Sequence, residues 1–142
     1  MISIPNYTIE KEIGSGGMAT VFLAIQDKLK RQVALKVMTP EMAKDDNFRK
    51  SFMREATIIA SLDHPNIIRI YDVEVIDNST LYMAMEYLSG NTLKEKLLKG
   101  KMSLTESLRV IGEISEGLTH AHSKGYIHRD IKCNGQVFLE DF

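Results

Sequence analysis

Residues 7–38 read YTIEKEIGSGGMATVFLAIQDKLKRQVALKVM. Short runs rich in β-branched and aromatic residues alternate here with turn-forming stretches such as GSGG and DKLKR, which is the pattern of strands joined by tight loops. The segment therefore predicts three antiparallel strands, over 7–13, 20–26 and 32–38.

The periodicity becomes helical from Asp45. Apolar residues recur every three or four positions and share one helical face, with Asp45 or Asp46 available as the N-cap. The members of this face are Phe48, Phe52, Ala56 and Ile59. We expect this helix to end near Leu62, and two further strands to follow over 67–75 and 79–87 with a turn between them.

Two capping boxes indicate helices in the second half of the chain. Thr92 is followed by Glu95, and Ser103 by Glu106, at the spacing where side chain and backbone satisfy each other's free donors at a helix start. The second of these helices should span about 104–123. Its main stripe comprises Leu108, Ile111, Ser115, Leu118 and His122.

The composition shifts at residues 88–91, which read LSGN and are interpreted as a hinge. Strands dominate before this point and helices dominate after it. We therefore predict an α+β fold with two parts. The first, 1–87, contains five antiparallel strands and one long helix, and the second, 88–142, is helical.

Composition places the chain among soluble globular proteins. Of its 142 residues 44% are hydrophobic and 26% charged, and the formal net charge of −1 provides no global field to attract nucleic acid or an anionic membrane. The single cysteine, Cys133, has no partner for an internal disulfide, and no apolar run approaches the length of a membrane span. We expect a cytoplasmic protein with no membrane segment and no nucleic-acid partner.

A glycine-rich turn links the first two predicted strands. Its sequence GSGGMATV carries Gly14 and Gly16, has Ala19 where a third glycine is common, and ends at Val21. Glycines let a hairpin tip fold closely over phosphates, although an ordinary turn is the more common meaning of such a segment. A Walker loop is disfavoured because its Gly-Lys-Ser/Thr is absent. A dinucleotide-binding loop is disfavoured because it should open a helix, whereas a strand follows here.

Lys36 and Glu55 both occupy positions that call for an explanation. Lys36 ends the sequence VALK in the third predicted strand, and Glu55 lies in the predicted helix close to the apolar face. A charge beside an apolar stripe is expensive unless it is paired. An ion pair between Lys36 and Glu55 would account for both residues, and the alternative for Lys36 is a solvated lysine on an edge strand.

The segment YIHRDIK, residues 126–132, follows the long predicted helix. By itself, Asp130 between basic neighbours could be an ordinary surface charge cluster. The histidines at 64, 120 and 122 are interpreted as structural.

The order of these motifs is very improbable by chance: glycine hairpin, VALK, an acidic helix residue, MEYL and HRDIK. With the stretches EMAKDDNFRKSFMREATIIASLDHPNII (41–68) and MEYLSGNTL (85–93), the chain resembles the protein kinase family over essentially its whole length. The resemblance is to bacterial members with eukaryotic-type (Hanks-type) serine/threonine kinase domains. It implies a protein-kinase-like fold and ATP-dependent phosphoryl transfer to a Ser or Thr hydroxyl of a protein substrate.

The resemblance also implies which residues bind the nucleotide. Those that enclose adenine would be Ile13, Val21, Ala34, Met85 and Leu88. Hinge backbone hydrogen bonds would come from Glu86 and Leu88. The loop over the phosphates would comprise Gly14, Ser15, Gly16, Gly17, Met18 and Ala19. Lys36 would hold the α- and β-phosphates, oriented by Glu55.

For catalysis, the resemblance implies that Asp130 is the base that accepts the proton of the substrate hydroxyl. Lys132 is similar to the lysine that meets the γ-phosphate in serine/threonine-specific members. The expected cofactors are ATP and Mg²⁺, and the expected partner is a protein with a Ser or Thr acceptor.

The sequence departs from the family pattern at the metal ligands. The family has a metal-binding asparagine five residues after the catalytic aspartate, where this chain has Gly135, with Asn134 one residue earlier. The pair Asp141-Phe142 follows Asp130 too closely to be the family's DFG motif, which is otherwise absent. No metal ligand is therefore secure in this sequence.

From these departures we expect a chain truncated within its helical lobe and weakly active or inactive alone. The stripe of the helix at 104–123 would then be uncovered. Two alternatives to an active kinase stay open: a catalytically dead nucleotide-binding or interaction module, and a non-functional gene fragment. The intact VALK and HRD sequences favour a recent loss of activity over a protein that has long been inactive. Codons for the family's DFG and APE motifs in the downstream DNA would favour truncation.

Overall fold

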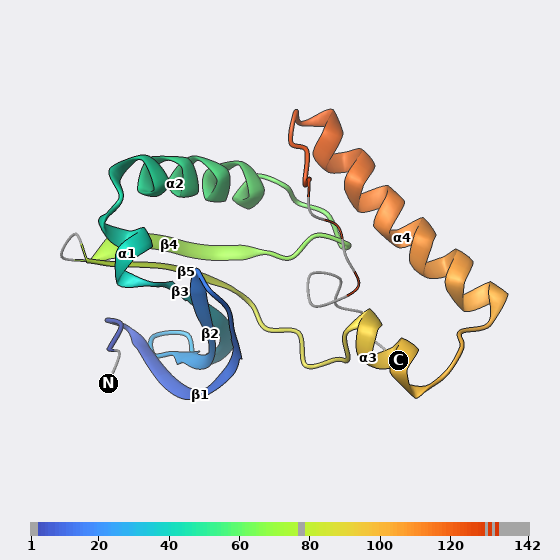
Figure 1. Ribbon diagram of the computed structural model, residues 1–142, viewed down its shortest axis with the longest axis horizontal. Coiled ribbons are helices and arrows are strands. Elements are labelled where there is room, and N and C mark those ends of the chain that lie inside the picture. The colour runs from blue at the N-terminus through green and yellow to red at the C-terminus, as the bar shows by residue number, and fades with distance from the viewer. Residues whose placement is uncertain (1–2, 77–78, 130, 132, 134–142) are drawn as a thin grey trace. The chain divides into compact units, whose positions relative to one another are not determined.

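The computed structural model describes residues 3–76, 79–129, 131 and 133 (Figure 1). The chain forms two compact units. The first consists of Met1–Ser61 and Ile68–Tyr87, and the second of Leu62–Ile67 and Leu88–Phe142. The predicted division at residues 88–91 assigns 62–67 to the first part, whereas the structure groups this loop with the second unit.

The first unit is built on one five-stranded sheet. Its strands are β1 (Tyr7–Ser15), β2 (Ala19–Gln26), β3 (Arg31–Met38), β4 (Ile70–Ile76) and β5 (Thr80–Glu86). They lie in the order β1-β2-β3-β5-β4, and every neighbouring pair is antiparallel. The predicted five-stranded antiparallel sheet is confirmed, with boundaries shifted by up to three residues.

Alternation along β3 separates the two faces of this sheet. Val33, Leu35 and Val37 project from one face, where they join the larger hydrophobic core of the unit. The other buried members of this core are Ile4, Tyr7, Ala24, Tyr82 and Ala84. Ala34 and Lys36 therefore project from the opposite face.

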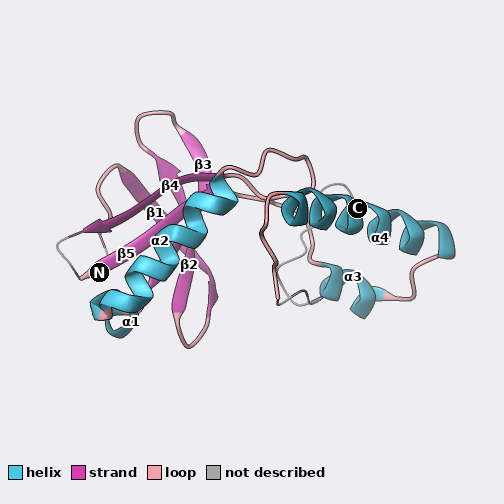
Figure 2. Cartoon of the chain, turned by 90° about the horizontal axis from the view of Figure 1, so that it is seen from above, coloured by secondary structure: helices cyan, strands magenta, loops and turns pink. Residues whose placement is uncertain are grey.

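Two helices cover part of that opposite face. They are α1 (Pro40–Lys44) and α2 (Asp46–Ala60), and α2 runs alongside β4 (Figures 1 and 2). A second core holds them on the sheet; its members are Ala19, Met38, Ala43 and Leu81, with Met42, Phe48, Phe52, Met53 and Val75 packed against it. Asp45 caps α2 by accepting hydrogen bonds from the N–H groups of Asn47 and Phe48, as predicted.

The second unit contains α3 (Leu93–Lys99) and α4 (Leu104–Ser123). Both predicted capping boxes are formed, at Thr92 with Glu95 and at Ser103 with Glu106. The buried residues of α4 are Val110, Gly117 and Ala121. The predicted stripe lies largely on the outer face, and the large apolar side chains of Leu104, Leu108 and Ile111 are 75%, 60% and 59% exposed.

Within the described part of the chain, no helix is long and apolar enough to cross a membrane.

Candidate active site

A row of paired residues across the sheet places Lys36. In the strand register, Lys36 on β3 lies opposite Val21 on β2 and opposite Met83 on β5, and Val21 in turn lies opposite Gly14 on β1. Directly opposed residues project from the same face of a sheet. Val21, Lys36 and Met83 therefore share the face that α1 and α2 cover only in part.

The next row along the sheet is apolar. Ala34 lies opposite Leu23 on β2 and opposite Met85 on β5, two residues before Lys36 in the same strand. Ala34 is 8% exposed, and its small side chain leaves the sheet surface low at this point. Of the expected adenine-enclosing residues, the structure thus brings Val21, Ala34 and Met85 together beside Lys36. Ile13 lies on β1 and is 41% exposed, while Leu88 belongs to the second unit.

The glycine-rich turn between β1 and β2 is open above its backbone. Gly16 donates its N–H to the carbonyl of Ala19 over 2.9 Å, which closes the hairpin tip. A Cβ atom built on Gly14 or Gly17 would meet nothing within 4 Å. Backbone donors that are not shielded by side chains can approach a phosphate closely, so this turn fits a phosphate group.

Lys36 and Glu55 are not joined in this structure. Among the described residues, none forms a hydrogen bond or an ion pair with the Lys36 side chain, which is half-buried. Glu55 is exposed on α2, the helix that covers the Lys36 face of the sheet. A solvated ion pair gains little free energy, so a contact between these two side chains is only weakly favoured where water reaches them. The expected pairing stays a prediction.

The end of β5 supplies the expected hinge residues. The backbone N–H of Glu86 donates to the carbonyl of Arg69 over 2.9 Å, and Glu86 also pairs with Val33 in the sheet register. The N–H of Glu86 is therefore already bonded to a main-chain carbonyl next to the start of β4. Any main-chain contact of Glu86 with adenine would have to use its carbonyl.

A polar cluster on the face of the sheet opposite Lys36 holds β5 against β4. The Tyr82 hydroxyl lies 2.9 Å from Oδ2 of Asp72 and 3.1 Å from Oε2 of Glu74, and the Tyr7 hydroxyl donates to Asp72 over 3.1 Å. Burial, followed by the nearby Asp72 carboxylate, raises the pKa of Tyr7 to about 12. Burial and the hydrogen bond to Asp72 also raise the pKa of Tyr82. These contacts hold the strand that carries Met83 and Met85.

The described part of the segment 126–133 belongs to the second unit. Arg129 has φ of 64°, a left-handed conformation that is uncommon for residues other than glycine and is often found at active sites. The carbonyl of Cys133 accepts a hydrogen bond from the N–H of Lys94 in α3 over 3.0 Å, which ties this segment to the helix. The predicted catalytic residues Asp130 and Lys132, and also Asn134, lie outside the described residues.

No cluster of three or more His, Cys, Asp or Glu residues suited to a metal ion occurs in the part of the chain that the structure describes. Mg²⁺ is commonly bound through one or two carboxylates and the substrate's phosphates, and seldom by a complete protein cage. The described residues therefore do not identify a metal ligand.

Sequence reasoning missed several residues that shape this region. Helix α1 has only five residues, which is too short for a periodic signal, although Pro40 at its first turn is a typical start. The contact of Lys94 with Cys133 and those of Asn66 with α4 link residues far apart in the sequence. No local pattern predicts such contacts.

Comparisons with known proteins agree with this geometry. The family model of the protein kinase domain matches residues 7–139. The serine/threonine-protein kinase PknJ of Mycobacterium tuberculosis is 41% identical over 126 residues, which are 89% of this chain and 21% of PknJ. PrkC of Bacillus subtilis, also a serine/threonine-protein kinase, is 43% identical over 144 residues, covering 96% of this chain and 22% of PrkC.

Among solved structures, the kinase domain of M. tuberculosis PknI is similar with a TM-score of 0.79 and 30% sequence identity, over 93% of this chain and 54% of that domain. The chain thus spans about a fifth of the length of these curated relatives and about half of a solved kinase domain. The sheet register, the glycine turn and these matches lead to one conclusion: the chain belongs to the protein kinase domain family, with bacterial Hanks-type serine/threonine kinases among its relatives.

Proposed function

We propose that the protein is an ATP-dependent serine/threonine protein kinase, which transfers the γ-phosphoryl group of ATP to a Ser or Thr hydroxyl of a protein. The observation that carries this proposal is the register of β2, β3 and β5. It places Val21, Ala34, Lys36 and Met85 on one face of the sheet beside the open glycine turn. A binding site for a nucleoside triphosphate requires an apolar patch for the base, a cation for the phosphates and unshielded backbone donors.

In this proposal the apolar row binds adenine. Ala34 and Met85 lie opposite each other on β3 and β5, and Val21 lies on β2 in the neighbouring row, opposite Lys36, with Ile13 and Leu88 as the further expected members. The carbonyl of Glu86 and the backbone of Leu88 would provide hinge contacts to the base. Specificity for a purine would then rest on main-chain groups, since the row itself offers only apolar side chains.

The phosphates would extend from the adenine row toward the glycine turn. Residues 14–19 would cover them with backbone N–H groups, and Lys36 would neutralise the α- and β-phosphates. With Lys36 held by the phosphates, an ion pair between Lys36 and Glu55 on α2 would form at a partly desolvated position, where the attraction between the two charges is stronger than in water.

Asp130 is proposed to accept the proton of the substrate hydroxyl as that oxygen attacks the γ-phosphorus. Lys132 would contact the γ-phosphate and offset its charge. Mg²⁺, which this family uses with ATP, would neutralise phosphate charge, and Asn134 is a candidate ligand in this sequence. The proposed setting is the cytoplasm, where ATP is available and the exposed Cys133 stays reduced.

Transfer of labelled phosphate from [γ-³²P]ATP to a generic protein substrate tests the proposal. Any phosphate that the chain transfers should label Ser or Thr, at the low rate expected of the chain alone, and Asp130→Asn should reduce that rate by at least about a hundredfold, because general base catalysis contributes on that order. If the unmodified chain and Asp130→Asn both bind nucleotide but neither transfers phosphate, the result would instead support the catalytically dead nucleotide-binding module. The absence of both nucleotide binding and phosphate transfer would support the non-functional fragment.

A further inference from the structure

A concave surface of about 320 Å³ lies where α3 ends and α4 begins, inside the second unit. Its cationic groups belong to Lys96, Lys99 and Lys101. The other residues that matter for its chemistry are Asn91, Met102 and Glu106. We call this surface the lysine hollow.

Both glutamates between residues 91 and 106 are already engaged inside the protein. Oε2 of Glu95 accepts the N–H of Thr92 over 2.7 Å, as part of the capping box of α3. Glu106 accepts the N–H of Ser103 over 3.0 Å and pairs with Nζ of Lys96 over 3.1 Å. These carboxylates thus serve the two helix starts and one lysine.

Lys99 and Lys101 remain as exposed cations of the hollow. Among the described residues, neither forms an ion pair, and Nζ of Lys99 donates to the uncharged side-chain oxygen of Asn91 over 3.4 Å. Two cations that line one hollow repel each other, and an anion placed between them offsets that repulsion. The hollow therefore favours a negatively charged group from outside the protein.

Apolar side chains accompany these lysines. Met102 lines the hollow, and Leu98 and Leu104, which flank residues 99–103 in the sequence, are 77% and 75% exposed. Large apolar side chains that are exposed beside polar groups are typical of a surface that contacts another protein. A matching partner would carry apolar residues between its acidic ones.

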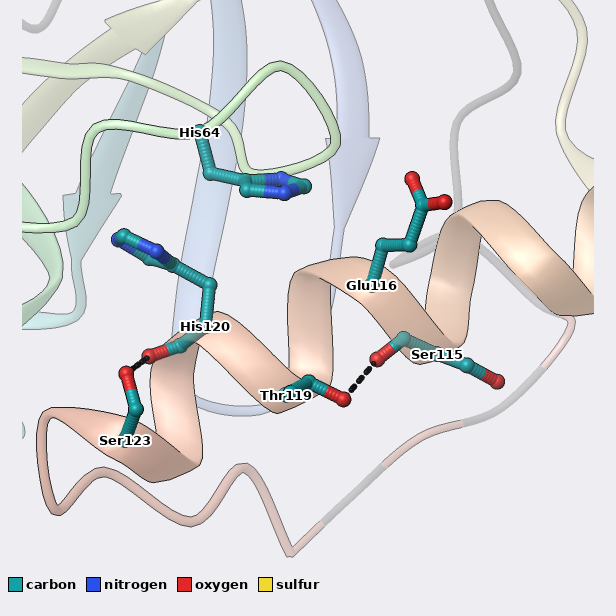
Figure 3. A pocket seen from close by; sticks show the side chains of 6 residues that line it. All are labelled: His64, Ser115, Glu116, Thr119, His120 and Ser123. Atoms are coloured by element: carbon teal, nitrogen blue, oxygen red, sulfur yellow. Dashed lines mark hydrogen bonds between the residues drawn. The ribbon is translucent and has the colours of Figure 1, made fainter.

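The next acidic residues of α4 lie further along the helix. Glu113 pairs with Arg109 over 2.9 Å, and Glu116 lines a different pocket together with His64 (Figure 3). Glu116 lies ten residues beyond Glu106, which is about 15 Å along a helix. Salt screens exposed charges over about 8 Å under physiological conditions, so Glu116 does not repel an acidic group at the hollow.

We propose that the lysine hollow binds an acidic segment of a protein partner, whose carboxylates contact Lys99 and Lys101. The chain as a whole has a formal net charge of −1, so the attraction acts only near the hollow. A short acidic segment fits such a local surface better than a membrane or a nucleic acid, which present negative charge over a wide area. In the proposed kinase this partner is the protein substrate. The substrate role rests on the proposed function, whereas the binding itself does not.

Fluorescence anisotropy tests the binding, with the full chain titrated into a labelled peptide of Glu-Asp-Leu repeats. Lys99→Gln combined with Lys101→Gln should weaken affinity about fivefold or more, because two exposed charge contacts are lost and each contributes a factor of about two to five. Lys28→Gln combined with Lys50→Gln is the control, since it removes the same charge from exposed positions of the first unit. This control should leave the affinity within about twofold of the parent.

Three results of the anisotropy titration would overturn the proposal. They are equal weakening in the two double variants, equal binding of a peptide of Gln-Asn-Leu repeats, and no binding of the acidic peptide by the unmodified chain. Vesicles of phosphatidylcholine mixed with phosphatidylserine provide the comparison with a membrane. If these vesicles bind through Lys99 and Lys101 while the acidic peptide does not, the occupant is an anionic lipid surface and the proposal is wrong.

Phosphate transfer from [γ-³²P]ATP tests the substrate role. Two peptides share one Ser acceptor, and one continues with Glu-Asp-Leu repeats whereas the other continues with Gln-Asn-Leu repeats. The acidic peptide should have a KM about fivefold lower in the unmodified chain and in the Lys28 and Lys50 control. This difference should disappear in the Lys99 and Lys101 variant, with kcat unchanged.

Equal KM values for the two peptides in the unmodified chain would overturn the substrate role. A fall in kcat that accompanies the change in KM would show that the two lysines act on the reaction itself, which would also contradict docking. If the chain transfers no phosphate to either peptide, the proposed function fails for this chain, and the anisotropy titration still decides whether the lysine hollow binds an acidic segment.

Discussion

The hydroxyl of Tyr82 lies 2.9 Å from Oδ2 of Asp72, inside the core that backs the proposed nucleotide face. Tyr82 is 1% exposed, so its hydroxyl depends on protein partners. We expect Tyr82→Phe to lower the free energy of unfolding by about 1–3 kcal/mol, as for a lost hydrogen bond to a charged group. Urea denaturation measures this change. Tyr87→Phe is the control, because its hydroxyl has no hydrogen bond to another described residue, and an equal loss in both variants would contradict the assignment.

The same cluster predicts a response to alkali. The pKa of Tyr7 is raised from 10 to about 12 in the folded state, and that of Tyr82 is also raised, so the unfolded chain loses these protons first. The stability that the two protonated tyrosines contribute is fully present below pH 10. It is lost as the pH rises from 10 through their folded-state pKa values. The free energy of unfolding should therefore fall above pH 10, and less steeply in Tyr82→Phe. Parallel curves for the two proteins would show that Tyr82 is not responsible.

The start of α4 predicts a response to acid. The backbone N–H of Ser103, followed by Lys96, lowers the pKa of Glu106 from its usual 4.5 to about 2. A depressed pKa contributes stability that is present above 4.5 and is lost as the pH falls toward 2. Glu106→Gln should therefore be less stable than the parent at pH 7, with the difference shrinking between pH 4.5 and 2. Thermal melts against the exposed Glu12→Gln provide the comparison, and a difference that persists at pH 2 would refute the role of the charge.

The cap itself can be tested at Ser103. Its hydroxyl accepts the N–H of Glu106 over 3.2 Å. Ser103→Ala should lower the free energy of unfolding by about 1 kcal/mol, the usual cost of a lost N-cap. Thr105→Ala, at an exposed position in the first turn of the helix, should change it much less, and the reverse order would contradict the capping role.

The outer face of α4 predicts different sensitivity at neighbouring positions. Leu108 is 60% exposed and Val110 only 3%. Leu108→Gln should change the free energy of unfolding by less than about 0.5 kcal/mol, as surface substitutions do, and should reduce binding of a hydrophobic dye. Val110→Gln should destabilise the chain by more than about 2 kcal/mol, because it buries an amide without partners. Similar melting temperatures for the two variants would show that the helix buries a different face.

The sequence was a good guide to the elements of the sheet and to the helix starts. The sequence contains local signals for both, namely the period of two in residues 20–26 and 32–38 and the capping boxes at Thr92 and Ser103. Such signals depend only on residues close together in the chain, so they can be recognised before the fold is known. The same alternation also predicts that Ala34 and Lys36 share one face of their strand, because they are two residues apart. The row of Val21, Lys36 and Met83 needed the register, which depends on pairing between distant strands.

The contacts of the loop at 62–67 with α4 could not be predicted from the sequence. His64 and His120 were interpreted as structural, but their contact joins residues distant in the chain. Gly117 in a helical pattern indicates only that some neighbour comes close. Which neighbour it is follows from the fold, where the backbone of Asn66 lies over it.

The central claim is that the face carrying Lys36 binds ATP, and calorimetric titration of Mg²⁺-ATP into the purified chain tests it most directly. The account predicts saturable binding that depends on Mg²⁺, is weakened at least about tenfold by Lys36→Met through loss of a charged phosphate contact, and is unchanged by Lys50→Met, an exposed lysine on α2. Binding that is absent, or equally strong in Lys36→Met, would contradict it.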